Sequence, residues 1–273
     1  MSSFTTIALD KLARLIGQPK APVILDVRTE ENVAADPRLI PASLRRPATA
    51  AADWAPAFAG QAAVTVCRRG RKLSEGAAAW IRQAGGTAEA LAGGFEAWAK
   101  AGLPLVPLAR LPPRDPLGRT VWVTRARPKI DRIACPWLIR RFIDADAEFL
   151  YVPSDQVLAV AAATGATPYD IPGVEYSHVG EACSFDAFIR LHQLSDPALA
   201  ELAVIVRGAD TGRLDLAPQC AGLLAQSLGL SVLYPNDHEM LGHGLHMYDA
   251  YFAWLKQARG EAHHWTPPIR VVD

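Results

Sequence analysis

Apolar and polar positions alternate in short blocks through the first hundred residues. Residues 23–27 and 62–66 are apolar runs of the length of a buried strand. Residues 74–83 are rich in alanine and favour a helix, which Gly85-Gly86 would end. Because buried strands and helices follow one another along the chain, the pattern predicts a parallel α/β sheet flanked by helices in the N-terminal part.

The second half has a different pattern. Residues 121–124 and 149–152 predict strands, and residues 134–143 place apolar side chains at helical spacing. Arg140 and Arg141 fall on the other side of that helix, where we expect a solvated face. Further helices are predicted at residues 155–163, 197–206, 217–228 and 239–255. These elements predict a mixed, helix-rich α/β domain.

A proline-rich stretch separates the two patterns. Residues 105–119 lack hydrophobic periodicity and contain Pro107, Pro112, Pro113 and Pro116. A chain of 273 residues is also longer than most single domains. We therefore predict an N-terminal domain at residues 1–107, a linker at 108–119 and a second domain at 120–273.

Charge and cysteine content limit the location and the partners. The 28 basic and 28 acidic side chains cancel, so we expect neither a nucleic acid nor a membrane as partner. The sequence shows no signal peptide and no apolar run long enough to cross a bilayer. Its four cysteines are scattered, which favours free thiols in a reducing compartment. These features predict a cytoplasmic protein and leave a homo-oligomer open.

Cys67 is the strongest candidate for chemistry. It follows the second apolar run and opens the loop Cys67-Arg68-Arg69-Gly70-Arg71-Lys72. Four basic side chains and the N–H groups of a turn entering a helix favour a thiolate. A phosphatase loop needs an arginine six positions after the cysteine, where this chain has Leu73. The shorter loop suits the outer sulfur of a persulfide on Cys67.

From about residue 7 to residue 107 the sequence resembles a rhodanese domain. The resemblance rests on Asp26-Val27-Arg28, the Cys67 loop, and Gly93-Gly94-Phe95-Glu96-Ala97-Trp98 with Gly102-Leu103-Pro104. The sequence departs from the family where a Gly-His-Ile-Pro-Gly-Ala-like segment is expected, at Asp36-Pro37-Arg38-Leu39-Ile40-Pro41-Ala42-Ser43.

The rhodanese resemblance implies a sulfurtransferase. Cys67 would take sulfane sulfur from an anionic donor such as thiosulfate and pass it, as a persulfide, to a thiol or cyanide. This transfer requires no cofactor. The resemblance also implies donor binding by Arg68, Arg69, Gly70, Arg71 and Lys72. Asp26 and Arg28 are expected to orient the loop rather than to touch the donor.

From about residue 120 to residue 257 the chain resembles the C-terminal domain of chromate-resistance proteins of the ChrB type. The matching segments are Trp122-Val123-Thr124-Arg125, residues 131–144, His178-Val179-Gly180-Glu181, Cys183-Ser184-Phe185-Asp186 and residues 206–212. The resemblance implies a context of chromate or oxyanion stress.

Two kinds of site are candidates in this second half. Arg125, Arg132 and Arg207 are candidates for an oxyanion site, because guanidinium groups match tetrahedral dianions such as chromate. His178, Glu181 and Asp210, with His243 as a further ligand, are candidates for a divalent metal such as zinc, manganese or iron. The metal prediction rests on clustering alone, because no spacing matches a known zinc motif.

A second function therefore stays open beside sulfur transfer. The chain could be a regulatory protein that senses chromate or a metal, with the rhodanese fold as a recognition module. Cys135 and Cys183 are expected to be buried as small hydrophobes. A relay of sulfur from Cys67 to Cys183 is a weaker hypothesis, suggested only by the fusion.

Overall fold

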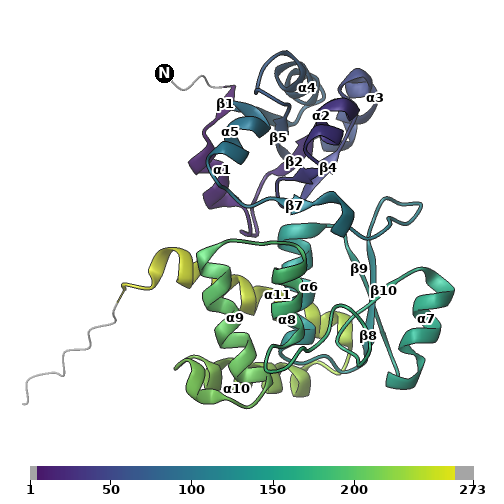
Figure 1. The fold of residues 1–273 in the computed structure, drawn as a ribbon, viewed down its shortest axis with the longest axis vertical. Helices are drawn as coiled ribbons and strands as arrows, with labels where there is room; N and C mark the ends of the chain where they lie inside the picture. The colour runs from purple at the N-terminus through teal and green to yellow at the C-terminus, as the bar shows by residue number, and fades with distance from the viewer. Residues whose placement is uncertain (1–4, 262–273) are drawn as a thin grey trace, which may run out of the picture.

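A computed structural model describes residues 5–261, so the outermost residues of both predicted domains, 1–4 and 262–273, lie outside it. The chain forms two lobes, with the N-terminal residues in one and the C-terminal residues in the other (Figure 1). Within residues 5–261, none of the helices combines the length and the apolar character needed to cross a bilayer.

The N-terminal lobe is built on a five-stranded parallel sheet in the order β1-β6-β5-β2-β4. Its strands are β1 (Thr6–Ile7), β2 (Val23–Asp26), β4 (Ser43–Arg45), β5 (Ala62–Val66) and β6 (Thr87–Leu91). Its helices are α1 (Leu9–Leu15), α2 (Glu30–Ala35), α3 (Ala51–Trp54), α4 (Lys72–Gln83) and α5 (Gly94–Lys100), with short 3-10 turns at Ala48–Ala50 and Ala55–Phe58. The predicted parallel α/β sheet is confirmed.

Helix α4 shows how the sequence positions the cysteine loop. Its buried face carries the apolar side chains of Ala77, Ala78 and Ile81, together with Ser74 in the first turn. Ala78 and Ile81 pack with Leu25 of β2 and Ala63 of β5 in one cluster of buried residues. Because α4 starts at Lys72, the five residues 67–71 must turn from the end of β5 into the first turn of that helix.

The segment that departs from the rhodanese pattern lies at the junction of the lobes. Its strand β3 (Arg38–Leu39) pairs antiparallel with β7 (Val106–Pro107), and the N–H of Leu108 donates to the carbonyl of Pro37 at 2.8 Å. The N–H of Ala42 donates across the junction to the carbonyl of Phe142 at 2.7 Å. The proline-rich stretch therefore begins as a strand attached to the N-terminal lobe, followed by the 3-10 turn Leu108–Arg110.

The C-terminal lobe contains a three-stranded parallel sheet in the order β10-β8-β9. Its strands are β8 (Val121–Arg125), β9 (Glu148–Val152) and β10 (Thr167–Pro168). Its helices are α6 (Asp131–Leu138), α7 (Val157–Thr164), α8 (Ser184–Leu191), α9 (Pro197–Asp210), α10 (Cys220–Leu233) and α11 (Asp237–Ala253). Short turns are 3-10 at Ser154–Gln156 and Leu214–Leu216, and π-helical at Ile139–Ile143 and Trp254–Ala258.

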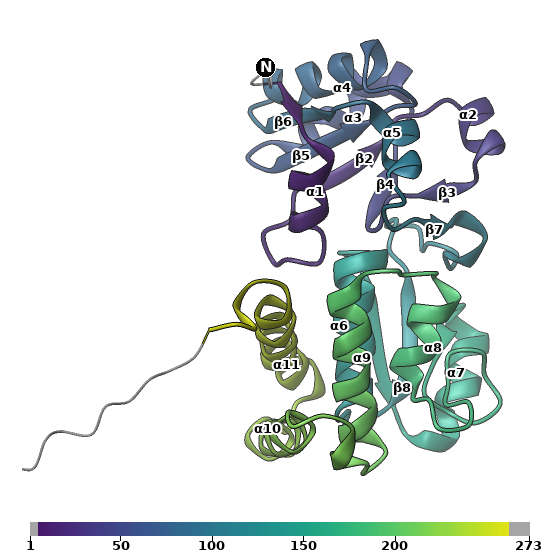
Figure 2. The same cartoon turned by 60° about the vertical axis from the view of Figure 1, so that its left-hand side comes forward.

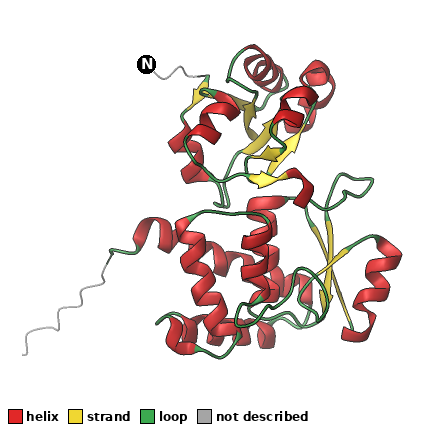
Figure 3. Ribbon diagram, viewed as in Figure 1, coloured by secondary structure: helices red, strands yellow, loops and turns green. Residues whose placement is uncertain are grey.

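The sheet of this lobe lies between α7 and the other helices (Figure 1), and α10 and α11 lie to the left of α6 and α9 in Figure 2. Side chains of β8 alternate between the two faces, as a strand requires. Val123 packs with Val157 of α7 on one face, whereas Trp122 packs against Phe188 of α8 on the other. Helix dominates the lobe and the strands are few (Figure 3), which confirms the predicted mixed, helix-rich α/β class.

One cluster of buried residues continues from lobe to lobe. It includes Trp98 of α5 as well as Trp137 of α6 and Phe252 of α11. Gly17, after α1, lies so close to the C-terminal lobe that an added Cβ would be 2.6 Å from the rings of Phe142 and Phe252. The two halves are thus packed on a shared core and not merely tethered by the linker.

The prediction that Arg140 and Arg141 form a solvated face is wrong for Arg141. Its guanidinium donates to both carboxylate oxygens of Asp249 at 2.8 and 2.7 Å. Asp249 is buried on α11 and also accepts from the indole of Trp137 at 2.8 Å. Because α11 packs along α6, its carboxylate is within reach of the arginine.

Candidate functional site

Cys67 is held at the carboxyl end of β5 by contacts to its sulfur and its backbone. Its Sγ lies 3.1 Å from the hydroxyl of Ser74 and accepts from the N–H of Arg71 at 3.3 Å. Its carbonyl accepts from the N–H of Phe95 at 2.9 Å, which ties the loop to α5. At Gly70, φ is +64° and an added Cβ would be 2.2 Å from the carbonyl oxygen of Leu91. The loop therefore curls around the sulfur and needs glycine to do so.

The pKa of Cys67 lies below that of an ordinary thiol. Burial opposes ionisation, but the Ser74 hydroxyl and the backbone N–H groups of Arg71, Ser74 and Arg69 outweigh it. The side chains of Arg68 and Arg69 instead pair with Glu96, the latter at 3.0 Å. Of the two groups expected to favour the thiolate, the backbone N–H groups contact the sulfur, together with the Ser74 hydroxyl.

Asp26 and Arg28 form a buried ion pair beside the loop. The Nε of Arg28 donates to the Asp26 carboxylate at 2.8 Å, and its terminal nitrogens donate to the carbonyls of Asp36 and Arg38 at 3.2 and 2.6 Å. The guanidinium also lies 3.6 Å from the ring centre of Phe95. Arg28 thus joins the 36–38 segment to α5, the helix that carries one of the loop contacts.

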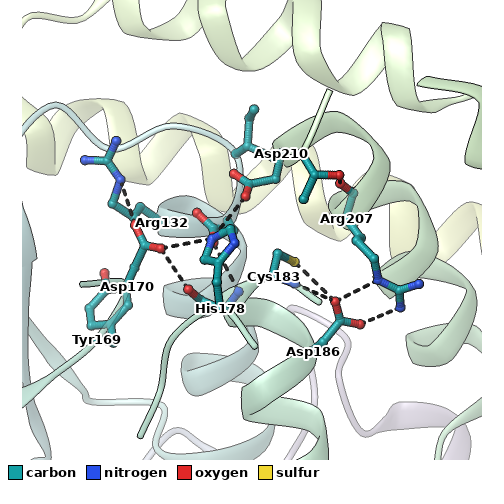
Figure 4. A network of polar contacts seen from close by, with 12 residues as sticks. Arg132, Tyr169, Asp170, His178, Cys183, Asp186, Arg207 and Asp210 are labelled. Carbon is teal, nitrogen blue, oxygen red and sulfur yellow. Dashed lines mark hydrogen bonds and ion pairs between the residues drawn. The ribbon is translucent and has the colours of Figure 1, made fainter. Parts of the chain in front are cut away.

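A second polar centre lies in the C-terminal lobe (Figure 4). The Nε2 of His178 is 3.2 Å from Oδ2 of Asp131, 3.4 Å from Oδ1 of Asp170 and 3.3 Å from Oδ2 of Asp210. Asp131 is the first residue of α6 and Asp210 the last of α9, while Asp170 and His178 belong to the loop between β10 and α8. The His178 side chain is 41% exposed and those of Asp131 and Asp170 are 3% exposed, so the centre opens to solvent at the imidazole. We call these four residues the His178 cluster.

Proximity changes the acid–base behaviour of this cluster. The hydrogen bond to Asp131 raises the pKa of His178 to about 9, against the effect of burial, and the charges of Asp210 and Asp170 add to it. Burial and the Asp131 carboxylate raise the pKa of Asp210 to about 7. Burial and Asp131 also raise the pKa of Asp170. Bringing three acids together in a largely buried place disfavours having all of them charged.

Neighbouring groups fix the orientation of the buried acids. Arg125 and Arg132 approach Oδ2 of Asp170 at 2.7 and 3.2 Å. The hydroxyl of Ser184 donates to Oδ1 of Asp170 at 2.8 Å, and its N–H donates to Asp131 at 3.3 Å. The carboxylates therefore cannot turn away from the imidazole without losing these bonds.

The structure brings only part of the predicted metal set together. His178 and Asp210 meet, but the Glu181 side chain is 86% exposed and faces Arg213 at 3.3 Å. The ring of His243 stacks on Tyr234, with centroids 3.9 Å apart. The predicted roles of Glu181 and His243 as ligands beside His178 are therefore wrong. Sequence reasoning missed Asp131 and Asp170 as members of this cluster, although Asp131 opens one of the segments that resemble ChrB.

The predicted oxyanion arginines do not converge on one place. Arg125 and Arg132 pair with Asp170, whereas Arg207 forms two bonds with Asp186 at 2.9 and 2.6 Å. Each guanidinium already has a carboxylate partner, so an oxyanion would have to compete with it. The three arginines do not form a shared anion site.

Cys135 and Cys183 are buried, as expected, and so is Cys220. Cys135 and Cys183 carry free thiols, and burial raises the pKa of both. A thiol held in this neutral form is a poor nucleophile. This environment disfavours the relay from Cys67 to Cys183.

The N-terminal lobe has a five-stranded parallel sheet with a cysteine loop between β5 and α4, and solved structures of rhodanese-like proteins are similar to it. Among similar solved structures, a rhodanese-related protein from Thermoplasma volcanium is 22% identical, with a TM-score of 0.33, over 37% of this chain and 96% of that one. A rhodanese-like domain protein from Staphylococcus aureus is 27% identical, with a TM-score of 0.31, over 34% of this chain and 90% of that one.

The C-terminal lobe is assigned by sequence comparison. Residues 122–255 match the family model of the ChrB C-terminal domain, so this part of the chain carries that domain. Protein ChrB of Cupriavidus metallidurans is 31% identical over 153 residues, which cover 55% of this chain and 45% of that protein. The chain thus spans less than half the length of this relative. The resemblance to the ChrB C-terminal domain is confirmed, and rhodanese-like proteins are among the similar solved structures.

Proposed function

We propose that this protein is a rhodanese-type sulfurtransferase that carries sulfane sulfur as a persulfide on Cys67. The observation that carries the proposal is the environment of the sulfur. The Ser74 hydroxyl and loop N–H groups lower the pKa of a buried thiol at the end of β5. A thiolate is the nucleophile that attacks a sulfane sulfur.

The transfer balances in two displacements. The Cys67 thiolate attacks the outer sulfur of thiosulfate, a new S–S bond forms on Cys67, and sulfite leaves with the electron pair of the broken S–S bond. Cyanide or an external thiolate then attacks the outer sulfur, and the electron pair of the persulfide bond returns to Cys67 as thiolate. No further reactant is consumed.

The surface of the loop supports an anionic donor. Arg71 and Lys72 are exposed beside the buried sulfur, and Arg68 and Arg69 lie next to them. Cationic groups around a small opening raise the local concentration of an anion such as thiosulfate. The ChrB resemblance supports chromate or other oxyanion stress as the setting in which this transfer operates.

Intact-mass analysis after thiosulfate treatment tests the proposal. Wild-type protein is expected to gain one sulfur atom, and Cys67→Ala to gain none. Cys183→Ala is the matched control, because its thiol is buried in the other lobe, and this variant should gain the sulfur as wild type does. Folded wild type that gains no mass, or Cys67→Ala that still gains it, would contradict the assignment.

A further inference from the structure

We propose that the His178 cluster binds one divalent first-row transition-metal ion through His178, Asp131 and Asp170, with Asp210 beside them. This inference goes beyond sulfur transfer, since none of these residues belongs to the Cys67 loop. The ligand atoms of Asp131, Asp170 and His178 all lie within 4.8 Å of one another. Imidazole combined with carboxylates suits manganese, iron or zinc.

The spacing of the ligand atoms fits a coordination shell. Metal–ligand bonds of about 2.0–2.2 Å give ligand–ligand edges of roughly 3.3–3.6 Å in a tetrahedron and about 3.0 Å in an octahedron. The distances from His178 Nε2 to the three carboxylates are 3.2, 3.4 and 3.3 Å. Each carboxylate therefore lies at a separation from the nitrogen that a shared ion requires, and Asp131, Asp170 and His178 together meet the spacing of a single site.

Hydrogen bonding alone does not satisfy this arrangement. The Nε2 of an imidazole carries at most one hydrogen, yet here it faces three carboxylate oxygens. An ion in place of the imidazole hydrogen would be shared by the nitrogen and the carboxylates of Asp131 and Asp170.

The surroundings have the features of a metal site. Ser184 donates hydrogen bonds to Oδ1 of Asp170 and to the carboxylate of Asp131, and arginines pair with Oδ2 of Asp170. Residues around a metal site commonly orient its ligands through such hydrogen bonds. Asp210 ends α9, where the helix dipole disfavours a negative charge and a nearby cation would offset it. The exposed edge of His178 provides a path of entry.

Metal binding to the full chain tests the inference, with Mn²⁺ and Zn²⁺ as probes. Protein freed of metal with a chelator is dialysed against each ion, and bound metal is measured by elemental analysis and, for Mn²⁺, by loss of the free-ion electron paramagnetic resonance signal. Wild type is expected to bind about one ion per chain. His178→Ala and Asp210→Asn should each bind about tenfold more weakly or worse. Glu181→Gln is the matched control and should bind as wild type does, because its carboxylate faces solvent.

Thermal unfolding separates lost ligands from lost structure. A bound ion stabilises the folded state, so Mn²⁺ should raise the Tm of wild type and of Glu181→Gln but not that of folded His178→Ala. Cys67→Ala should keep metal binding, which keeps this test independent of sulfur transfer. The inference is overturned if wild type binds neither ion, or if His178→Ala binds as tightly as wild type; the cluster is then an ion-pair network only.

Discussion

The Cys67 loop and the His178 cluster handle negative charge in opposite ways. In the loop, one sulfur is surrounded by backbone N–H groups and the hydroxyl of Ser74, all of them neutral. In the cluster, three carboxylates surround one imidazole, and charged groups supply most of the interactions. Neutral donors lower the pKa of a single thiol and leave it open to attack an electrophile. Carboxylates that lie close together are instead stabilised by a cation. We therefore infer a nucleophile in one lobe and a metal ion in the other.

The largest effect is expected at the buried ion pair that braces the loop. The Arg28 and Asp26 side chains are 1% and 2% exposed, so Arg28→Ala leaves a buried carboxylate without its cation. Breaking such a pair costs about 3–5 kcal/mol of unfolding free energy, measured by urea denaturation. Arg38→Ala is the control, because its pair with Asp36 is partly exposed and worth at most about 1 kcal/mol. Equal losses in the two variants would show that the pair does not brace the lobe.

The two regions also differ in how far the sequence could predict them. The Cys67 loop is contiguous, so its strand, its glycine and its helix could be predicted from neighbouring residues. The residues of the His178 cluster are far apart in the sequence, since Asp131 and His178 are 47 positions apart. No local sequence pattern predicts that they lie in contact. Glu181 was chosen because it is near His178 in sequence, but the turn between them directs it to solvent.

In the second lobe, the charges of the arginines alone did not predict which groups they pair with. Arg125 and Arg132 are cationic in the sequence, yet their partner Asp170 lies beside them only because β10 pairs with β8. Strand β7 was missed for a related reason: a two-residue strand has no hydrophobic period, and only its pairing with β3 defines it. Patterns within one element are readable in a sequence, whereas pairings between distant elements are not.

A smaller effect is expected from the turn of the loop itself. Gly70→Ala adds a methyl group 2.2 Å from a carbonyl oxygen at a φ of +64°, so the loop must shift away from Cys67. We expect a loss of about 1–3 kcal/mol in unfolding free energy and a larger fractional loss of sulfur transfer. Gly76→Ala is the control: nothing lies within 4 Å of the added methyl group, and alanine in the helix should stabilise by about 0.5–1 kcal/mol. Unchanged sulfur loading in Gly70→Ala would show that the curl of the loop is not needed.

The smallest effect is expected on the pH dependence of persulfide formation, which tests whether neutral donors or charged side chains stabilise the thiolate. Ser74→Ala removes a donor to the sulfur, so the pKa of Cys67 should rise. The thiolate fraction grows as pH rises through that pKa, and the rising limb of the pH–rate profile for persulfide formation should therefore move to higher pH. Transfer is slower near neutral pH and approaches the wild-type rate once pH exceeds both pKa values.

Lys72→Ala is the companion variant, because Lys72 is exposed and is not among the groups that lower the pKa of Cys67. This variant should bind thiosulfate more weakly, and its binding should depend less on salt concentration. The rising limb of its pH–rate profile should stay at the wild-type position. If Lys72→Ala moves the limb and Ser74→Ala does not, the thiolate depends on charge, and the contrast with the His178 cluster fails. A rate in Ser74→Ala that stays low even at high pH would instead indicate a displaced loop, since ionisation is then complete in both proteins.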